Sequence, residues 1–176
     1  ALMDDEDDDF EDDFEEDYDE FYEEFVNEDN YVRQTFGDLQ FLEEVYAQFS
    51  KNELLEIAKA HGFRGYSKYD KHSLREWLIA NLLEKQYFQD YILHADKEEL
   101  RVFENAIEQN GIYLPEEMLY RSLFLSTYGG FLPYYNFYHI PKDVKEKYKE
   151  CMTEEIREKR EIIQYFYDVC YSAIYL

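Results

Sequence analysis

Apolar side chains recur every three or four residues along most of this chain, which is the spacing of amphipathic helices. A short helix of this kind is predicted just before Ser50, where the apolar residues are Leu39, Leu42, Val45, Tyr46 and Phe49. Ser50 and Glu53 then form a capping-box sequence, which predicts a helix over 51–61. Gly62 follows as a natural C-terminal stop.

A second helix is predicted after Asp70, whose carboxylate can accept hydrogen bonds from the first free amides of a helix. It is expected to run to Glu84, with its apolar residues on one face: Leu74, Trp77, Leu78 and Leu82. We expect the lone tryptophan to anchor the core. Residues 50–84 are therefore predicted to form a small module of helix, extended loop and helix, with flanking helices over 38–94.

Residues 96–176 are predicted to form a second helical region. Asp96 and Glu99 make another capping box, and the helix that they open has Leu100, Phe103 and Ile107 on one face and ends at Gly111. Pro115 suits the first turn of the next helix, which is predicted to continue to the glycine pair at 129–130.

A short β-hairpin is predicted over 131–140, with its turn near Asn136. Two helices followed by a hairpin is the order of a winged helix. The helix that would read DNA, 116–128, carries one arginine, two acids and many apolar side chains, a poor surface for a DNA groove. We expect it to be core or a partner-binding element.

The chain ends in a further pair of predicted helices. Pro141 begins the first, and Thr153 is the expected N-cap of the second, whose apolar residues are Ile156, Ile163, Phe166, Tyr167, Cys170 and Ile174. Its last turns are apolar nearly all round, so we expect them to be buried against the preceding half or against segments beyond Leu176. In the second case we expect the chain to be a piece of a longer protein. The resulting fold class is mainly α with one short β-hairpin.

Charge separates the first thirty residues from the rest. They hold 18 of the 42 acidic residues and no lysine or arginine, which leaves 24 acids against 18 bases in the remainder. Aromatic residues recur through this acidic segment at helical spacing, namely Phe10, Phe14, Tyr18, Phe21, Tyr22 and Phe25. Like-charge repulsion favours a solvated, disordered tail, and the alternative is a helix that docks through its aromatic stripe. Either form suits a basic protein partner.

Three sequence runs in the module carry a family resemblance: 53–59, with a leucine-rich helix; 62–68, with Gly-Phe-Arg-Gly-Tyr-Ser-Lys; and 71–79, which begins Lys-His-Ser-Leu-Arg. This stretch resembles the N-terminal domain of transcription terminator Rho and, more distantly, SAP modules. The resemblance covers about 35 of the 176 residues. It implies a helix, extended loop, helix fold associated with RNA or DNA binding.

Residues of the module that could contact a nucleic acid are Lys59, Arg64, Tyr66, Lys68, Lys71 and Arg75. The bases would contact phosphates and a tyrosine could stack on a base. Over 51–85, seven bases against five acids give a local charge of only +2, so binding is expected to be weak. The alternative is that the tyrosines fill a small core and the lysines are ordinary solvated surface.

The sequence contains none of the short motifs of nucleotide-binding folds, serine hydrolases or zinc proteases. The two cysteines, Cys151 and Cys170, lie 19 residues apart in no metal-binding pattern. We therefore expect a non-enzymatic cytoplasmic protein with no catalytic residue, metal, cofactor or membrane contact, and leave its oligomeric state open. Two functions are predicted: weak nucleic-acid binding restrained by the acidic tail, or a protein-interaction adaptor that uses the tail and the apolar C-terminal helix.

Overall fold

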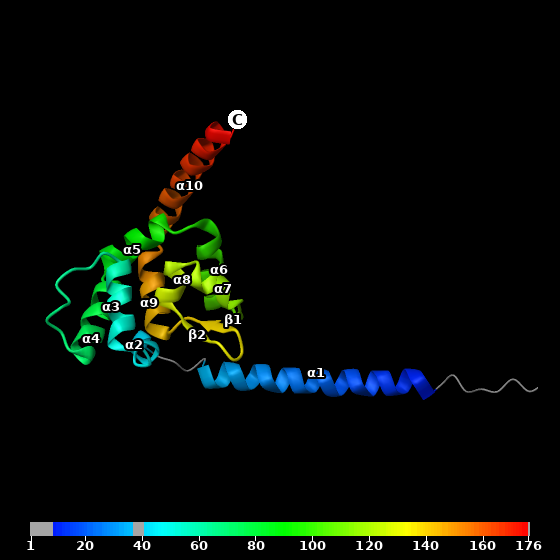
Figure 1. Ribbon diagram of the computed structural model, residues 1–176. Coiled ribbons are helices and arrows are strands. Elements are labelled where there is room, and N and C mark those ends of the chain that lie inside the picture. The colour runs from blue at the N-terminus through cyan, green and yellow to red at the C-terminus, as the bar shows by residue number, and fades with distance from the viewer. Residues whose placement is uncertain (1–8, 37–40, 176) are drawn as a thin grey trace, which may run out of the picture. The chain divides into compact units, whose positions relative to one another are not determined.

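The computed structural model describes residues 9–36 and 41–175, with the side chains of 18–34 in the first helix. The described chain contains ten helices and one three-stranded antiparallel sheet (Figure 1), which confirms the predicted mainly helical fold with a short hairpin. Residues 1–36 and 37–176 form two separate units.

The acidic segment contains a long helix, α1 (Asp9–Phe36). Of the two alternatives for this segment, a disordered tail or a helix, the described part is therefore the helix. Near its C-terminal end Arg33 lies 3.0 Å from Asp29, one turn earlier, an attractive pair at the spacing that supports a helix. The predicted stripe residues Phe10 and Phe14 have side chains outside the described set.

The module begins with α2 (Leu42–Tyr46) and α3 (Lys51–Ala60); the predicted apolar position Leu39 lies outside the described residues. The capping box is formed as predicted, because Ser50 Oγ accepts from the amide of Glu53 at 3.2 Å and the Glu53 carboxylate accepts from the amide of Ser50 at 2.6 Å. Gly62 follows with a φ of 72°, which glycine adopts without strain.

The next helices are α4 (Lys71–Leu82) and α5 (Lys85–His94). Asp70 caps α4 as predicted, with its carboxylate 2.8 Å from the Ser73 amide. The prediction that this helix runs to Glu84 was wrong. Glu84 instead caps α5, because its carboxylate oxygens accept from the amides of residues 86 and 87 at 3.1 and 2.8 Å.

The C-terminal region contains α6 (Lys97–Glu108), β1 (Ile112–Tyr113), α7 (Glu116–Tyr120) and α8 (Leu123–Tyr128). Three details differ from the sequence-based expectation. Strand β1 was not predicted, and Pro115 is the N-cap of α7 and not its first residue. The single helix expected up to 129 is interrupted, since the hydroxyl of Ser122 accepts from the Leu125 amide at 3.0 Å and starts a new helix.

The hairpin consists of β2 (Gly130–Leu132) and β3 (Phe137–His139), with Asn136 at a φ of 51° in its turn. Strand β1 adds to the other edge of β3, so the sheet order is β1, β3, β2. The element order from α6 to β3 is helix, strand, helix, helix, strand, strand, which keeps the predicted winged-helix order. Helix α8 lies within 116–128, the segment that would read DNA in a winged helix. It buries most of its side chains: Phe124, Leu125, Thr127 and Tyr128.

One hydrophobic core joins the module to the C-terminal region. Two buried tyrosines cross between them: the hydroxyl of Tyr46 donates to the carbonyl of Thr127 at 2.7 Å, and that of Tyr128 donates to the carbonyl of Leu82 at 2.8 Å. Buried polar groups must be paired, so these bonds let large phenol rings fill the core without a desolvation penalty. Trp77, the predicted anchor, is only half-buried and packs at the edge of this core.

The chain continues through α9 (Lys142–Cys151) and α10 (Glu154–Tyr175). Thr153 is the predicted cap of α10, and its hydroxyl accepts from the Ile156 amide at 3.3 Å. Ile156 is buried in the core. Figure 1 shows the last turns of α10 extending beyond the other helices, so the prediction that they are buried against the preceding half was wrong.

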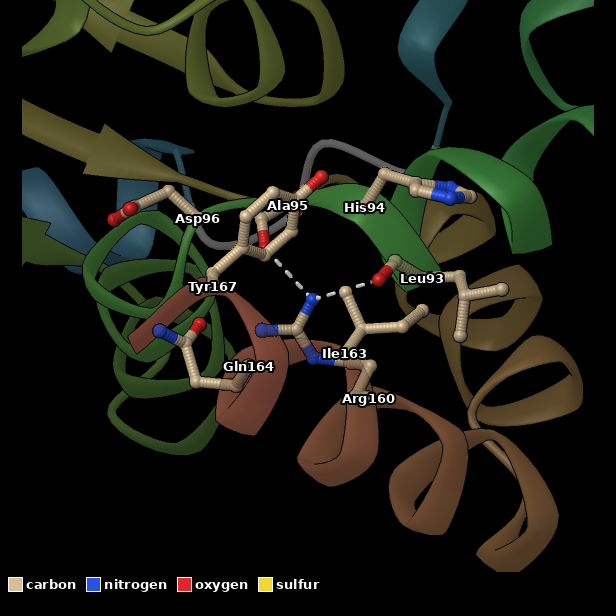
Figure 2. A pocket seen from close by; sticks show the side chains of 8 residues that line it. All are labelled: Leu93, His94, Ala95, Asp96, Arg160, Ile163, Gln164 and Tyr167. Atoms are coloured by element: carbon tan, nitrogen blue, oxygen red, sulfur yellow. Dashed lines mark hydrogen bonds between the residues drawn. The ribbon is translucent and has the colours of Figure 1, made fainter. Parts of the chain in front are cut away.

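A single arginine holds the base of α10 to α5. Nη1 of Arg160 donates to the carbonyls of Ile92, Leu93 and Ala95 at 2.6, 3.4 and 2.7 Å. Figure 2 shows the bonds to Leu93 and Ala95. These carbonyls lie at the C-terminal end of α5, where the partial negative charge of the helix dipole favours a cation. A cavity of about 250 Å³ surrounds the contact. The guanidinium therefore fixes where α10 leaves the rest of the fold.

Replacing this arginine should destabilise the protein. Arg160→Ala is expected to lower the free energy of unfolding by about 2 kcal/mol, because it removes charge-assisted bonds to half-buried carbonyls. The neighbouring Lys159 pairs only with Glu155 on the surface, at 3.0 Å. Lys159→Ala should therefore cost no more than about 0.5 kcal/mol. Urea unfolding of both variants checks this, and equal effects would contradict the role given to Arg160.

Candidate functional site

The last fifteen residues of α10, 161–175, carry their polar side chains along one line. Glu161, Gln164, Asp168 and Ser172 follow one another at steps of three, four and four, which places them on one side of a helix. At 1.5 Å per residue this segment is about 22 Å long. It contains two carboxylates and no lysine or arginine.

The opposite side of the same segment is apolar. We call it the α10 face, and its residues are Ile162, Ile163, Phe166, Val169, Cys170 and Ile174. Phe166 is 62% and Ile174 76% exposed, and only Ile163 is half-buried, at the cavity beside Arg160. Exposed tyrosines flank the face: Tyr165, Tyr167, Tyr171 and Tyr175.

So much contiguous apolar surface is unusual for a helix in contact with water. Hydrophobic faces of this kind are otherwise found buried in cores or at interfaces with other proteins. This composition predicted that the last turns of α10 are buried. In the structure the core of residues 42–156 is closed without these turns, since α10 contributes only Ile156 to the buried cluster. The α10 face is therefore exposed in the described part of the chain.

Helix α1 presents a second row of exposed aromatic side chains. Tyr18, Phe21, Tyr22 and Phe25 are all more than half exposed. The same helix carries 13 acidic residues and a single base, Arg33. A ligand for α1 must therefore combine positive charge with apolar contact.

The predicted nucleic-acid contacts divide into two groups. Arg64, Lys68 and Lys71 are exposed on the loop after α3 and at the start of α4. Nζ of Lys68 lies 5.2 Å from the ring centre of Tyr69, within the range of a cation–π contact. We call these three exposed bases the loop cations.

The other candidates are engaged within the fold. Tyr66 is half-buried, with its ring centre 6.3 Å from that of Trp77. The side chain of Arg75 is 16% exposed and lies 3.4 Å from the carboxylate of Glu43 on α2. Lys59 is exposed and pairs with Glu56 at 3.3 Å on its own helix. Tyr66 and Arg75 thus stabilise the module itself.

Comparison with protein-family models, with curated proteins and with solved structures found no match for this chain. The function has to be argued from the surfaces alone.

A half-buried histidine, for which the sequence predicted no role, connects three helices. Nδ1 of His61, at the end of α3, lies 2.6 Å from the hydroxyl of Tyr87 on α5, and Nε2 lies 2.8 Å from Oγ1 of Thr127 on α8. Burial lowers the pKa of His61 to about 4, so the ring is neutral at neutral pH. The partners are 26 and 66 residues away in sequence, and no local pattern could have indicated them.

In the part of the chain that the structure describes, no helix is both long and apolar enough to cross a membrane. Within the same residues, no three histidine, cysteine or acidic side chains gather as a metal site would require. The candidate sites are therefore the α10 face, α1 and the loop cations.

The shifted histidine predicts acid sensitivity. An unfolded histidine has a pKa of 6.5 and folded His61 one of about 4, so only the unfolded state takes up this proton between those values. Stability should therefore fall as the pH is lowered from about 6.5 to 4, by about 1–2 kcal/mol from this partly exposed ring. Urea unfolding across this range should show a shallower pH dependence for His61→Gln than for the wild type. Equal slopes in the two proteins would contradict the assignment.

Proposed function

We propose that this protein is a non-enzymatic cytoplasmic adaptor that binds other proteins through the α10 face and through the acidic helix α1. The observation that carries the proposal is the exposure of the α10 face, a row of large apolar side chains on a helix that is anchored at its base by Arg160. An anchored helix loses little conformational entropy when a partner binds. The free energy gained by burying its apolar surface is therefore offset little by the cost of ordering the helix.

The chemistry of the α10 face indicates the kind of partner. Its centre is aliphatic and aromatic, and tyrosines, which are enriched at interfaces, flank it on both sides. The carboxylates of Glu161 and Asp168 lie on the polar line of the same helix, and this segment contains no base. The complementary partner is an amphipathic helix whose aliphatic anchors, at helical spacing, cover the α10 face and whose lysine or arginine side chains lie beyond those anchors.

Helix α1 supports the same class of function by a different route. Its carboxylates repel one another along the helix, and a basic partner would relieve this repulsion while it covers Phe21, Tyr22 and Phe25. Binding to α1 is therefore expected to weaken steeply with salt. Binding to the apolar α10 face should be less sensitive to salt.

Substitutions on the two sides of α10 test the main proposal. Proteins captured on the intact chain are identified, purified and titrated by calorimetry. Phe166→Asp should weaken binding by at least about 30-fold, the cost of losing a central aromatic anchor. Gln164→Glu, on the polar line of the same helix, should change it less than about threefold. The partner should also protect the exposed thiol of Cys170 from a thiol reagent.

Two results would contradict this proposal. One is a partner that binds the wild type and Phe166→Asp equally. The other is a self-associating chain: if sedimentation equilibrium shows a dimer that Phe166→Asp dissociates, a second copy of the chain occupies the α10 face.

A second candidate function is weak binding of single-stranded nucleic acid by the module, with α1 competing for the same bases. The observation that favours it is the exposure of all three loop cations, with Lys68 next to the ring of Tyr69, in the segment that resembles the N-terminal domain of Rho. A few phosphate contacts suffice for weak binding, and it would be strongest at low salt.

Deletion of residues 1–30 should then raise the affinity for a labelled single-stranded RNA or DNA in 50 mM salt, as measured by fluorescence anisotropy. Replacing Arg64, Lys68 and Lys71 by glutamine should reduce the slope of log affinity against log salt by about 2, since each lost contact contributes about 0.7. The matched control replaces three lysines of α9: Lys142, Lys147 and Lys149. Undetectable binding by both the deleted and the intact chain would eliminate this candidate.

A further inference from the structure

A shallow groove of about 420 Å³ lies between α5 and the start of α6. Its lining residues are Tyr87, Asp90, Tyr91, His94, Ala95 and Glu99. Two tyrosines and two carboxylates dominate this set, and no lysine or arginine belongs to it. The groove is therefore rich in π-electrons and negative charge.

The two tyrosines form a fixed aromatic wall. Their ring centres lie 6.0 Å apart. The hydroxyl of Tyr87 is held by Nδ1 of His61 at 2.6 Å, and the ring of Tyr91 stacks on Phe124 at 5.8 Å with an angle of 17°. Side chains locked in this way need not reorganise when a ligand binds.

Both phenols are neutral at physiological pH. Burial raises the pKa of Tyr87 to about 12, and burial together with the nearby Glu99 carboxylate raises the pKa of Tyr91. Neutral phenol rings present the negative face of their quadrupole to a cation.

The two carboxylates of the groove come from different elements. Asp90 lies on α5, where its Oδ1 accepts from Gln86 Nε2 at 3.0 Å, and Glu99 lies on α6, where its Oε2 accepts from the amide of Asp96 at 3.4 Å. Each of these contacts engages one of the two oxygens of its carboxylate. A ligand with several donors in one plane suits a groove that offers two carboxylates and an aromatic ring.

We propose that this groove binds the guanidinium group of an arginine side chain from a basic peptide. Guanidinium has five N–H donors in a rigid plane and stacks on aromatic rings, so it can bridge two carboxylates and cover a tyrosine at once. The compact ammonium of lysine lacks this planar fork. The assignment stands on α5 and α6 and does not depend on the α10 face, on α1 or on the loop cations.

The test uses the full chain and a single arginine residue as ligand. N-acetyl-arginine methylamide is titrated into ¹⁵N-labelled protein, with chemical shifts followed by NMR. The expected dissociation constant is on the order of 1–10 mM, because one partly exposed cation–π contact and two solvent-screened ion pairs contribute little each. The amides of Tyr91 and Glu99 should shift most. The citrulline analogue, which is nearly identical in shape but uncharged, should leave them in place.

Conservative variants assign the effect to the groove. Glu99→Gln keeps the capping box of α6 and removes the charge, and should weaken arginine binding about threefold to fivefold. Adding Asp90→Asn should bring the loss to about tenfold. The control is Glu98→Gln, which removes the same charge from the same helical turn outside the groove and should leave the affinity unchanged.

Three outcomes would overturn the proposal. Shifts confined to α1 would show only a general attraction of cations to the acidic helix. Shifts of Tyr91 and Glu99 by citrulline would show that the groove does not recognise charge. Equal affinity for N-acetyl-lysine methylamide would remove the assignment to guanidinium.

Discussion

Hydrogen bonding of buried tyrosines is the constraint on which the rest of this structure depends. The chain has 19 tyrosines, too many to leave on the surface of so small a protein and too polar to bury unpaired. Three of the largest buried side chains are Tyr46, Tyr128 and Tyr138, and each donates its hydroxyl to a backbone carbonyl of another element. Each ring thereby fills the core while its hydroxyl crosslinks two parts of the fold.

These bonds also explain why the module and the C-terminal region behave as one unit. The segment that resembles a free-standing nucleic-acid module shares its core with α8 and α9, and His61 joins α3 to both α5 and α8. A module held on one side in this way keeps only its loop available for ligands. Protein interaction is therefore the broader proposal, and nucleic-acid contact is limited to the loop cations.

A closed core leaves the remaining aromatic side chains outside. On α10 the exposed aromatic side chains lie in and beside an apolar face, and on α1 they alternate with carboxylates. Tyr87 and Tyr91 line a groove together with two acidic residues. Two of these surfaces, α1 and the groove, combine aromatic rings with carboxylates, in keeping with the net charge of −24, whereas the α10 face is apolar. The proposals above therefore differ in how much positive charge and how much apolar contact a partner has to supply.

Local signals in the sequence were sufficient to predict the helices around Ser50, Asp70 and Asp96 and the hairpin at Asn136, because capping boxes and turn residues act within a few positions. The same signals misplaced boundaries where two caps compete, as at Glu84 and Ser122.

Which apolar faces are buried was decided only by the tertiary structure. The composition of α10 predicted that its last turns are buried, yet Ile156 is the residue of α10 that belongs to the described core. The long-range partners of His61 and Arg160 could not be predicted either, because local spacing carries no information about them. By itself the sequence determined that this is an acidic, mainly helical protein rich in aromatic surface. The tertiary structure decided which of those aromatic side chains are buried in the fold and which remain exposed, because burial depends on contacts between distant segments that periodicity cannot specify.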